Sequence, residues 1–137
     1  MNCKTLYRPV GLKELALIKH SGWKRFPPRL AWQPIFYPVI HQAYAEQIAR
    51  EWNTADAFGD YWGVVTAFDL ETSFLSKYPV QNVGNNGHDE LWIPAEDLEE
   101  FNNQIIGCIR VVNAFSGKGA TLPDDNELTA ILQKFKS

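Results

Sequence analysis

The segment from residue 88 to residue 115 constrains the fold most, because a strand, a helix and a second strand follow one another there with short connections. Residues 90–93 are typical of a strand, which Pro94 ends because proline has no amide hydrogen to give to a strand ladder. The next residues predict an amphipathic helix, with Leu98, Phe101 and Ile105 on one face and Glu96, Asp97, Glu99 and Glu100 mostly on the other. The apolar run 109–112 then predicts a buried strand.

Glu90 opens the first of these strands. A carboxylate at the edge of such a two-strand platform is well placed for chemistry. It is equally consistent with the polar edge of an ordinary strand. The residues of this segment alone leave both interpretations open.

A length of 137 residues suits one domain. A chain of this length buries about two thirds of the surface that its unfolded form exposes, which is enough for a core. With five Trp, five Tyr and eight Phe, aromatic rings must fill the core or a binding cleft. The net charge of -3 argues against a nucleic-acid surface built on bulk charge, although it leaves room for a local basic patch.

Cys3 and Cys108 are the two cysteines, and no CxxC motif or Cys/His cluster accompanies them. Cys108 lies in an apolar run, which predicts an inert core thiol. His20, His41 and His88 have no metal-ligand spacing, so we expect no metal site. Because the chain starts without a charged leader and an apolar region, and no apolar run has membrane-spanning length, we expect a cytoplasmic protein that is not in a membrane.

The first third of the chain predicts a strand at 5–8, with Pro9 near its end, and a helix at 11–20 that Ser21 and Gly22 close. The following residues, up to position 39, are rich in aromatic residues and prolines and cannot form a long helix. We expect an ordered loop there, with a short strand at 35–39.

The middle of the chain contains the clearest helix and the clearest strand. In the helix at 41–52, Tyr44, Ile48 and Trp52 recur every four residues beside Ala45 and Ala49, which favours a stripe that packs in the core over one that binds a ligand. Residues 61–70 alternate with a period of two and predict a strand. Shorter predicted elements are a helical turn at 73–78, a strand at 80–83 and a terminal helix at 126–135.

This order of elements predicts an α+β domain with small, mainly antiparallel sheets and short flanking helices. The helices are too few to cover both faces of a parallel sheet, and several strands are short. The expected division is a single domain at 1–115, followed by a linker and a C-terminal helix at 116–137.

Several short motifs resemble the ADP-ribosyltransferase toxins. The opening, KTLYRPVGLKELALIKHSGWKRFPPR, is similar to their start: a strand with Leu-Tyr-Arg, a helix, then Ser-Gly and a Pro-Arg turn. The later order is also similar: a strand at FYPV, an alanine-rich helix, the strand GVVTAFDLE, and a Glu that opens the strand ELWIP. The chain is similar, too, to small bacterial proteins of an ADP-ribosylation/crystallin type. The resemblance covers residues 4–115 and implies an ADP-ribosyltransferase-like fold, with NAD as substrate and an unknown protein or nucleic-acid acceptor.

The resemblance implies roles for particular residues. Arg8 matches the first-strand arginine, which supports the NAD site, and Glu90 matches the catalytic glutamate, which holds the nicotinamide ribose. The middle position has two candidates, Tyr37 by its place before the alanine-rich helix and Thr66 by chemical similarity to the family's Ser-Thr-Ser. Arginine-modifying members have a second Glu or Gln where this chain has His88, so His88 is a candidate acid, base or acceptor-side residue.

The chemistry of the residue types agrees with these roles. Guanidinium groups bind phosphate in a bidentate manner, so Arg8, Arg25 and Arg29 are candidates for a diphosphate clamp. The structural alternatives are an ion pair inside the fold for Arg8 and solvated loop positions for the other two. Because loops carry binding groups on a rigid scaffold, we also expect cleft residues in the aromatic loop, namely Trp23, Trp32, Phe36 and Tyr37.

Two hypotheses of different classes follow. The first is an NAD-dependent ADP-ribosyltransferase, which requires Arg8, Glu90 and either Tyr37 or Thr66 to meet in one cleft. The second is a non-catalytic module that keeps the fold and binds a nucleotide or a protein through the aromatic loop. The second hypothesis tolerates dispersal of these side chains.

Overall fold

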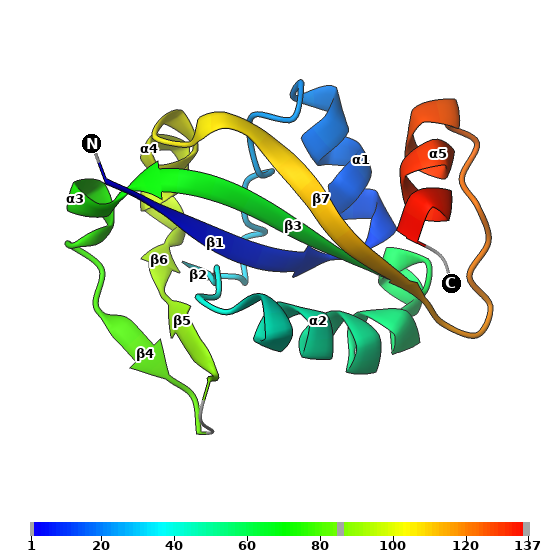
Figure 1. Ribbon diagram of the computed structural model, residues 1–137, viewed down its shortest axis with the longest axis horizontal. Coiled ribbons are helices and arrows are strands. Elements are labelled where there is room, and N and C mark those ends of the chain that lie inside the picture. The colour runs from blue at the N-terminus through cyan, green and yellow to red at the C-terminus, as the bar shows by residue number, and fades with distance from the viewer. Residues whose placement is uncertain (1, 85–86, 136–137) are drawn as a thin grey trace.

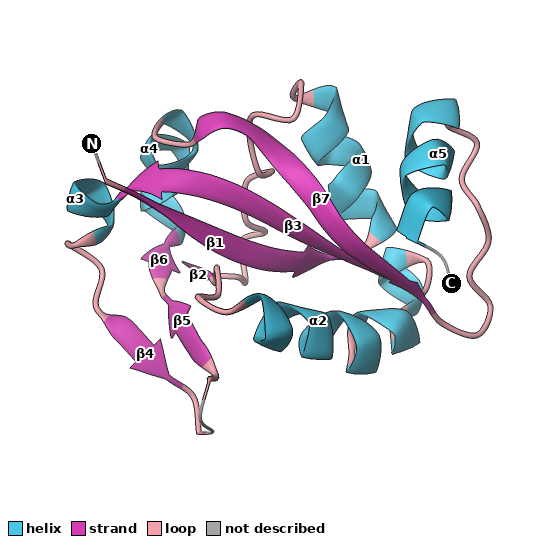
Figure 2. Ribbon diagram, viewed as in Figure 1, coloured by secondary structure: helices cyan, strands magenta, loops and turns pink. Residues whose placement is uncertain are grey.

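The central sheet places β3 (Trp62–Glu71) between β1 (Cys3–Val10) and β7 (Ile106–Ser116), and both neighbours run antiparallel to it (Figure 1). These strands come from a computed structural model, which describes residues 2–84 and 87–135. As the middle strand, β3 has nearly all of its residues buried. The α+β class with small antiparallel sheets and short helices is therefore confirmed, as Figure 2 shows.

Helices cover both faces of the central sheet. The alternation along β3 sends Val64 and Phe68 into the larger apolar cluster, together with Leu15 of α1 (Leu12–His20). Val65 points to the opposite face, where it packs with Ala45 of α2 (Gln42–Glu51). Because side chains alternate along residues 61–70, this strand contributes residues to two separate cores, one on each face of the sheet.

The contact face of α2 differs from the sequence prediction. Ala45 and Ala49 face the sheet, while Trp52, expected in the core, is 72% exposed. The cause is the close approach of α2 to β3, because a Cβ added at Gly63 would collide with the backbone of Ala49. Only small side chains fit into the closest contact, while Tyr44 and Ile48 pack partly buried beside it. The assignment of the stripe to the core is therefore wrong for Trp52 only.

A second group of short strands lies beside the central sheet (Figure 1). β2 pairs antiparallel with β6, and β4 pairs antiparallel with β5. The bounds of these strands are β2 Ile35–Phe36, β4 Val80–Asn82, β5 Asp89–Leu91 and β6 Ile93–Pro94. The predicted strand at 35–39 is thus shorter than expected, with one further bridging residue at Val39.

Val39 connects the two groups of strands through its backbone. It exchanges hydrogen bonds with Tyr7 of β1, with N···O distances of 2.9 and 2.7 Å, and it also bridges to Glu90 of β5. Beside it, the amide of Leu91 donates to the carbonyl of Pro38 at 2.9 Å. The strand that carries Glu90 is therefore held in a fixed relation to the strand that carries Arg8.

The remaining elements close the ends of the molecule. They are the short helices α3 (Thr72–Leu75) and α4 (Leu98–Asn103), the 3-10 turns η1 (Asn53–Ala55), η2 (Ala57–Gly59) and η3 (Ala95–Asp97), and the terminal helix α5 (Asn126–Phe135). α5 packs on β7, and its Leu128 and Leu132 belong to the larger apolar cluster. The residues that precede α5 are tied to β3, because the indole of Trp62 donates to the carbonyl of Thr121 at 2.9 Å.

β7 is less buried than the sequence predicts. It is an edge strand, and only Ile109 and Ala114 are buried along its length. Cys108 is exposed, so its assignment as a core thiol is wrong, and Cys3 is exposed as well. Among the described residues, no helix combines the length and the apolar character needed to cross a bilayer.

Tyr78 provides a test of the packing around α4. Burial raises the pKa of its phenol to about 12, and the hydrogen bond to Asp97 (3.1 Å) with the charges of Asp97 and Glu100 adds to the rise. The folded pKa lies above the usual value near 10, so the stabilisation is present below pH 10 and is lost as the pH rises towards 12. In urea titrations across this range, we expect the free energy of unfolding to fall more steeply for the wild type than for Tyr78→Phe. Parallel curves would contradict this.

Candidate functional site

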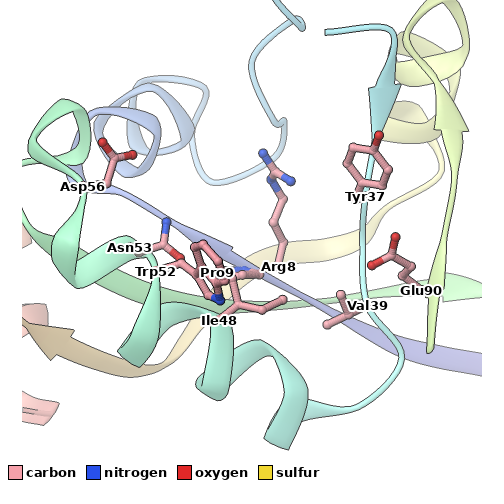
Figure 3. Close-up of a pocket in the computed structure, with 9 residues that line it drawn as sticks. All are labelled: Arg8, Pro9, Tyr37, Val39, Ile48, Trp52, Asn53, Asp56 and Glu90. Atoms are coloured by element: carbon pink, nitrogen blue, oxygen red, sulfur yellow. The ribbon is translucent and has the colours of Figure 1, made fainter. Parts of the chain in front are cut away.

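A cavity of about 390 Å³ opens between β1, α2 and the second group of strands (Figure 3). Its walls are formed by Arg8, Pro9, Tyr37, Val39, Ile48, Trp52, Asn53, Asp56 and Glu90. Three of the residues singled out in the sequence, Arg8, Tyr37 and Glu90, are thus brought to one cavity.

The backbone pairing of Val39 explains why these three side chains meet. Val39 bridges to Tyr7, the neighbour of Arg8, on one side and to Glu90 on the other. Tyr37 lies two residues before Val39, so both side chains point to the same side of an extended segment. Figure 3 shows Tyr37 and Glu90 on one wall and Arg8 rising from β1 beside them.

Arg8 is held in place by Glu14, the first-turn carboxylate of α1. Nε lies 2.8 Å from Oε2 and Nη2 lies 3.0 Å from Oε1, which is a bidentate ion pair. The guanidinium also lies 4.7 Å above the ring centre of Phe36, and the side chain is 11% exposed. Glu14 engages Nε and Nη2 of Arg8 but not Nη1, and no described residue accepts a hydrogen bond from Nη1. Nη1 can therefore still donate to a ligand.

Arg29 lies in a second cavity, of about 510 Å³, which shares Arg8, Pro9, Asn53 and Asp56 with the first. Its Nε donates to the carbonyl of Ile35 at 2.9 Å. Burial lowers the pKa of Arg29, and the nearby charge of Arg8 lowers it further. The second cavity is lined by three cationic side chains, Arg8, Arg29 and Lys13, against two carboxylates, Glu14 and Asp56, and this excess of positive charge favours an anion.

Glu90 has one carboxylate oxygen engaged. The indole Nε1 of Trp92 donates to Oε1 at 2.7 Å. The negative charge of Glu90 also acts on Tyr44 of α2. Burial raises the pKa of the Tyr44 phenol, and the charge of Glu90 raises this pKa further. The cavity therefore has a carboxylate on one wall and a guanidinium beside it.

The opposite wall is formed by Trp52 at the end of α2 together with Asn53 and Asp56 from the turns that follow. The sequence favoured a core position for Trp52, and Asn53 and Asp56 were not singled out. Asp56 caps η2 by accepting from the amide of Phe58 at 3.0 Å. Asn53 has a buried Oδ1 to which no described residue donates a hydrogen bond. The available signal was the cluster of polar residues directly after a helix, since loops carry binding groups.

The other candidates lie outside both cavities. Thr66 is fully buried, and its hydroxyl donates to the carbonyl of Arg8 at 2.8 Å. Phe36 is a core residue beneath Arg8. Trp32 is 75% exposed and lines neither cavity. Of the two candidates for the middle position, Tyr37 is therefore the one at the cavity.

His88 faces α2 instead of the cavity. Its Nε2 lies 3.2 Å from Oε1 of Gln47, and its ring stacks on Tyr44 with centroids 4.2 Å apart and planes 11° apart. Next to it, Asp89 accepts from Asn82 and contacts His41, and these contacts lower the pKa of Asp89. His88 and Asp89, the two residues before Glu90, thus hold β5 against α2 and the residue that precedes it.

The candidate site has no metal-binding character within residues 2–84 and 87–135, because no three His, Cys, Asp or Glu side chains there form a group that could hold an ion. What the cavities offer is different: aromatic walls and carboxylates that suit a cationic ring, and paired guanidinium groups that suit phosphate. A ligand with both features fits best.

No family model, curated protein or solved structure matches the chain. The residues of the two cavities are therefore the only structural indication of what the protein binds within the part of the chain that is described.

Thr66 provides a test of which residues act at the site. Thr66→Val removes the hydroxyl that bonds the Arg8 carbonyl, so we expect the free energy of unfolding to fall by about 1 kcal/mol. If the chain binds NAD, as the resemblance implies, the affinity measured by calorimetry should be unchanged in this variant, because the side chain lies outside both cavities. Thr66→Ser keeps the hydroxyl and is the matched control. Loss of NAD binding in a stable Thr66→Val protein would place Thr66 in the site.

Proposed function

We propose that the protein is an NAD-dependent ADP-ribosyltransferase with an ADP-ribosyltransferase-like fold, and that it acts in the cytoplasm. The observation that carries the proposal is that Arg8, Tyr37 and Glu90 line one cavity. The order of elements is a second support: a first strand with Arg8, a middle segment with Tyr37, and a later strand, β5, with Glu90 as its middle residue instead of its first.

The two cavities suit the two ends of NAD. The nicotinamide ring is cationic, and aromatic faces such as those of Tyr37 and Trp52, with the carboxylates of Glu90 and Asp56, stabilise a cationic ring. The diphosphate is anionic, and two guanidinium groups are available to it: Arg8, which lines both cavities, and Arg29, which lines the second. In this assignment the second cavity receives the adenosine half.

The proposed reaction breaks the bond between the ribose C1′ and the nicotinamide nitrogen. The bonding electron pair leaves with the nitrogen, so nicotinamide departs as a neutral ring and positive charge builds on the ribose. Glu90 stabilises that charge and holds a ribose hydroxyl. The acceptor then attacks C1′ and releases a proton. A well-placed electrostatic group of this kind lowers the barrier by about 2.7 to 4 kcal/mol.

The acceptor in this proposal is a protein or a nucleic acid. Arginine is not assigned as the acceptor group, since His88 stands two residues before Glu90 and its ring is bonded to Gln47 and stacked on Tyr44.

The second candidate is a non-catalytic binding module. The observation that favours it is the Arg8–Glu14 pair, in which Arg8 is 11% exposed, as in an ion pair that serves only the fold. The two candidates differ in turnover, because a binding module holds its ligand without cleaving it.

Glu90→Ala tests the enzyme proposal. We expect NAD cleavage to fall at least about 100-fold, because the developing charge on the ribose loses its carboxylate. Release of nicotinamide is measured by chromatography and folding by circular dichroism. Glu96→Ala removes an exposed carboxylate elsewhere and should keep full activity. If the wild type neither cleaves NAD nor binds it in calorimetry, only the binding-module candidate survives, with another ligand.

A further inference from the structure

Trp92 lies between β5 and β6, two residues after Glu90. Because side chains alternate along an extended chain, Trp92 and Glu90 point to the same side. The indole Nε1 donates a hydrogen bond of 2.7 Å to Oε1 of Glu90. A hydrogen bond to an ionised carboxylate is stronger than one between neutral groups. The indole of Trp92 is therefore bound to Oε1 of Glu90 by a strong hydrogen bond.

This bond determines how Glu90 presents its other oxygen. A free glutamate side chain has several rotatable bonds and samples many positions. With Oε1 held by Trp92, the direction of Oε2 is fixed as well, and no described residue donates a hydrogen bond to Oε2. Figure 3 shows the carboxylate on the cavity wall close to Tyr37. Oε2 is thus the oxygen left for a ligand.

The indole is held in turn by its surroundings. Its ring meets the ring of Tyr37 edge to face, with centroids 6.4 Å apart and planes at 84°. The backbones below are joined by the bridge between Val39 and Glu90 and by the hydrogen bond of 2.9 Å from Leu91 to Pro38. Although the side chain of Trp92 is 44% exposed, it has a defined orientation. The contacts with Tyr37 and Glu90 thus restrain the ring of Trp92 although it is not buried in the core.

We propose that Trp92 is a positioning residue, which orients the Glu90 carboxylate so that Oε2 faces the ribose of the bound dinucleotide. This role rests on the proposed NAD chemistry. It acts through Glu90, since Trp92 does not line the cavity. Its effect is on the transition state, where the position of the carboxylate matters most.

Trp92→Phe removes the indole N–H and keeps an aromatic ring against Tyr37. We expect kcat for NAD cleavage to fall about 10- to 100-fold while KM changes by less than about twofold, because ligand contacts stay in place. The matched control is Trp23→Phe, which removes an indole bond of 2.9 Å to the carboxylate of Glu127. Trp23 lies beside β7, on the opposite edge of the central sheet from β1, and lines neither of the two cavities. The control should keep the wild-type kcat.

A second measurement follows the hydrogen bond itself. In the ¹⁵N spectrum, Glu90→Gln should shift the indole N–H signal of Trp92 and leave that of Trp23 in place, whereas Glu127→Gln should do the reverse. This comparison keeps the indole, so it decides even if Trp92→Phe folds poorly. An unmoved Trp92 signal would overturn the proposal.

The outcomes also separate this proposal from the proposed function. Wild-type kcat in Trp92→Phe, with no cleavage by Glu90→Ala, would overturn the positioning role alone. Wild-type protein without NAD cleavage would overturn both. A fall in kcat for Trp92→Phe together with the shifted indole signal would support both.

Discussion

The backbone of Val39 is the connection on which the rest of the structure depends. Its two hydrogen bonds with Tyr7 and its bridge to Glu90 join the central sheet to the short strands beside it. Arg8 and Glu90 belong to different sheets, and the pairing of Val39 with both sheets fixes their positions relative to each other. Backbone hydrogen bonds fix the distance between paired strands, so the spacing of β1 and β5 determines the width of the cavity between them.

The elements followed from the sequence where one physical pattern dominated. The alternation of residues 61–70 gave β3, and the helical period gave α2 nearly to its ends. The face of α2 followed except at Trp52: Ala45 and Ala49 are buried, Tyr44 and Ile48 pack against them, and Trp52 at the end of the helix is exposed. Cys108 was misplaced because an apolar run predicts burial only if both faces of the strand are covered, and the residues on either side of Ile109 in β7 are exposed.

The site was only partly predictable. Arg8, Tyr37 and Glu90 came from short motifs, yet their meeting at one cavity depends on the backbone bonds of residues 38–40, which have no side-chain signature. An ion pair inside the fold was one alternative for Arg8, but its partner Glu14 was not named, since nothing in the spacing shows that the first turn of α1 folds back on β1. Asn53 and Asp56 were missed because they are positioned by turns, where sequence patterns are weakest. Trp52 was assigned to the core because it continues the apolar stripe of the helix.

The side-chain carbonyl of Asn53 sets the wall after α2 apart from the rest of the cavity. Its Oδ1 is buried, and no described residue donates a hydrogen bond to it. A buried acceptor without a donor costs about 1 to 3 kcal/mol. The turn that carries Asn53 is thus less stable by this amount than it would be with the bond made, and it is the part of the wall that rearranges at the lowest cost.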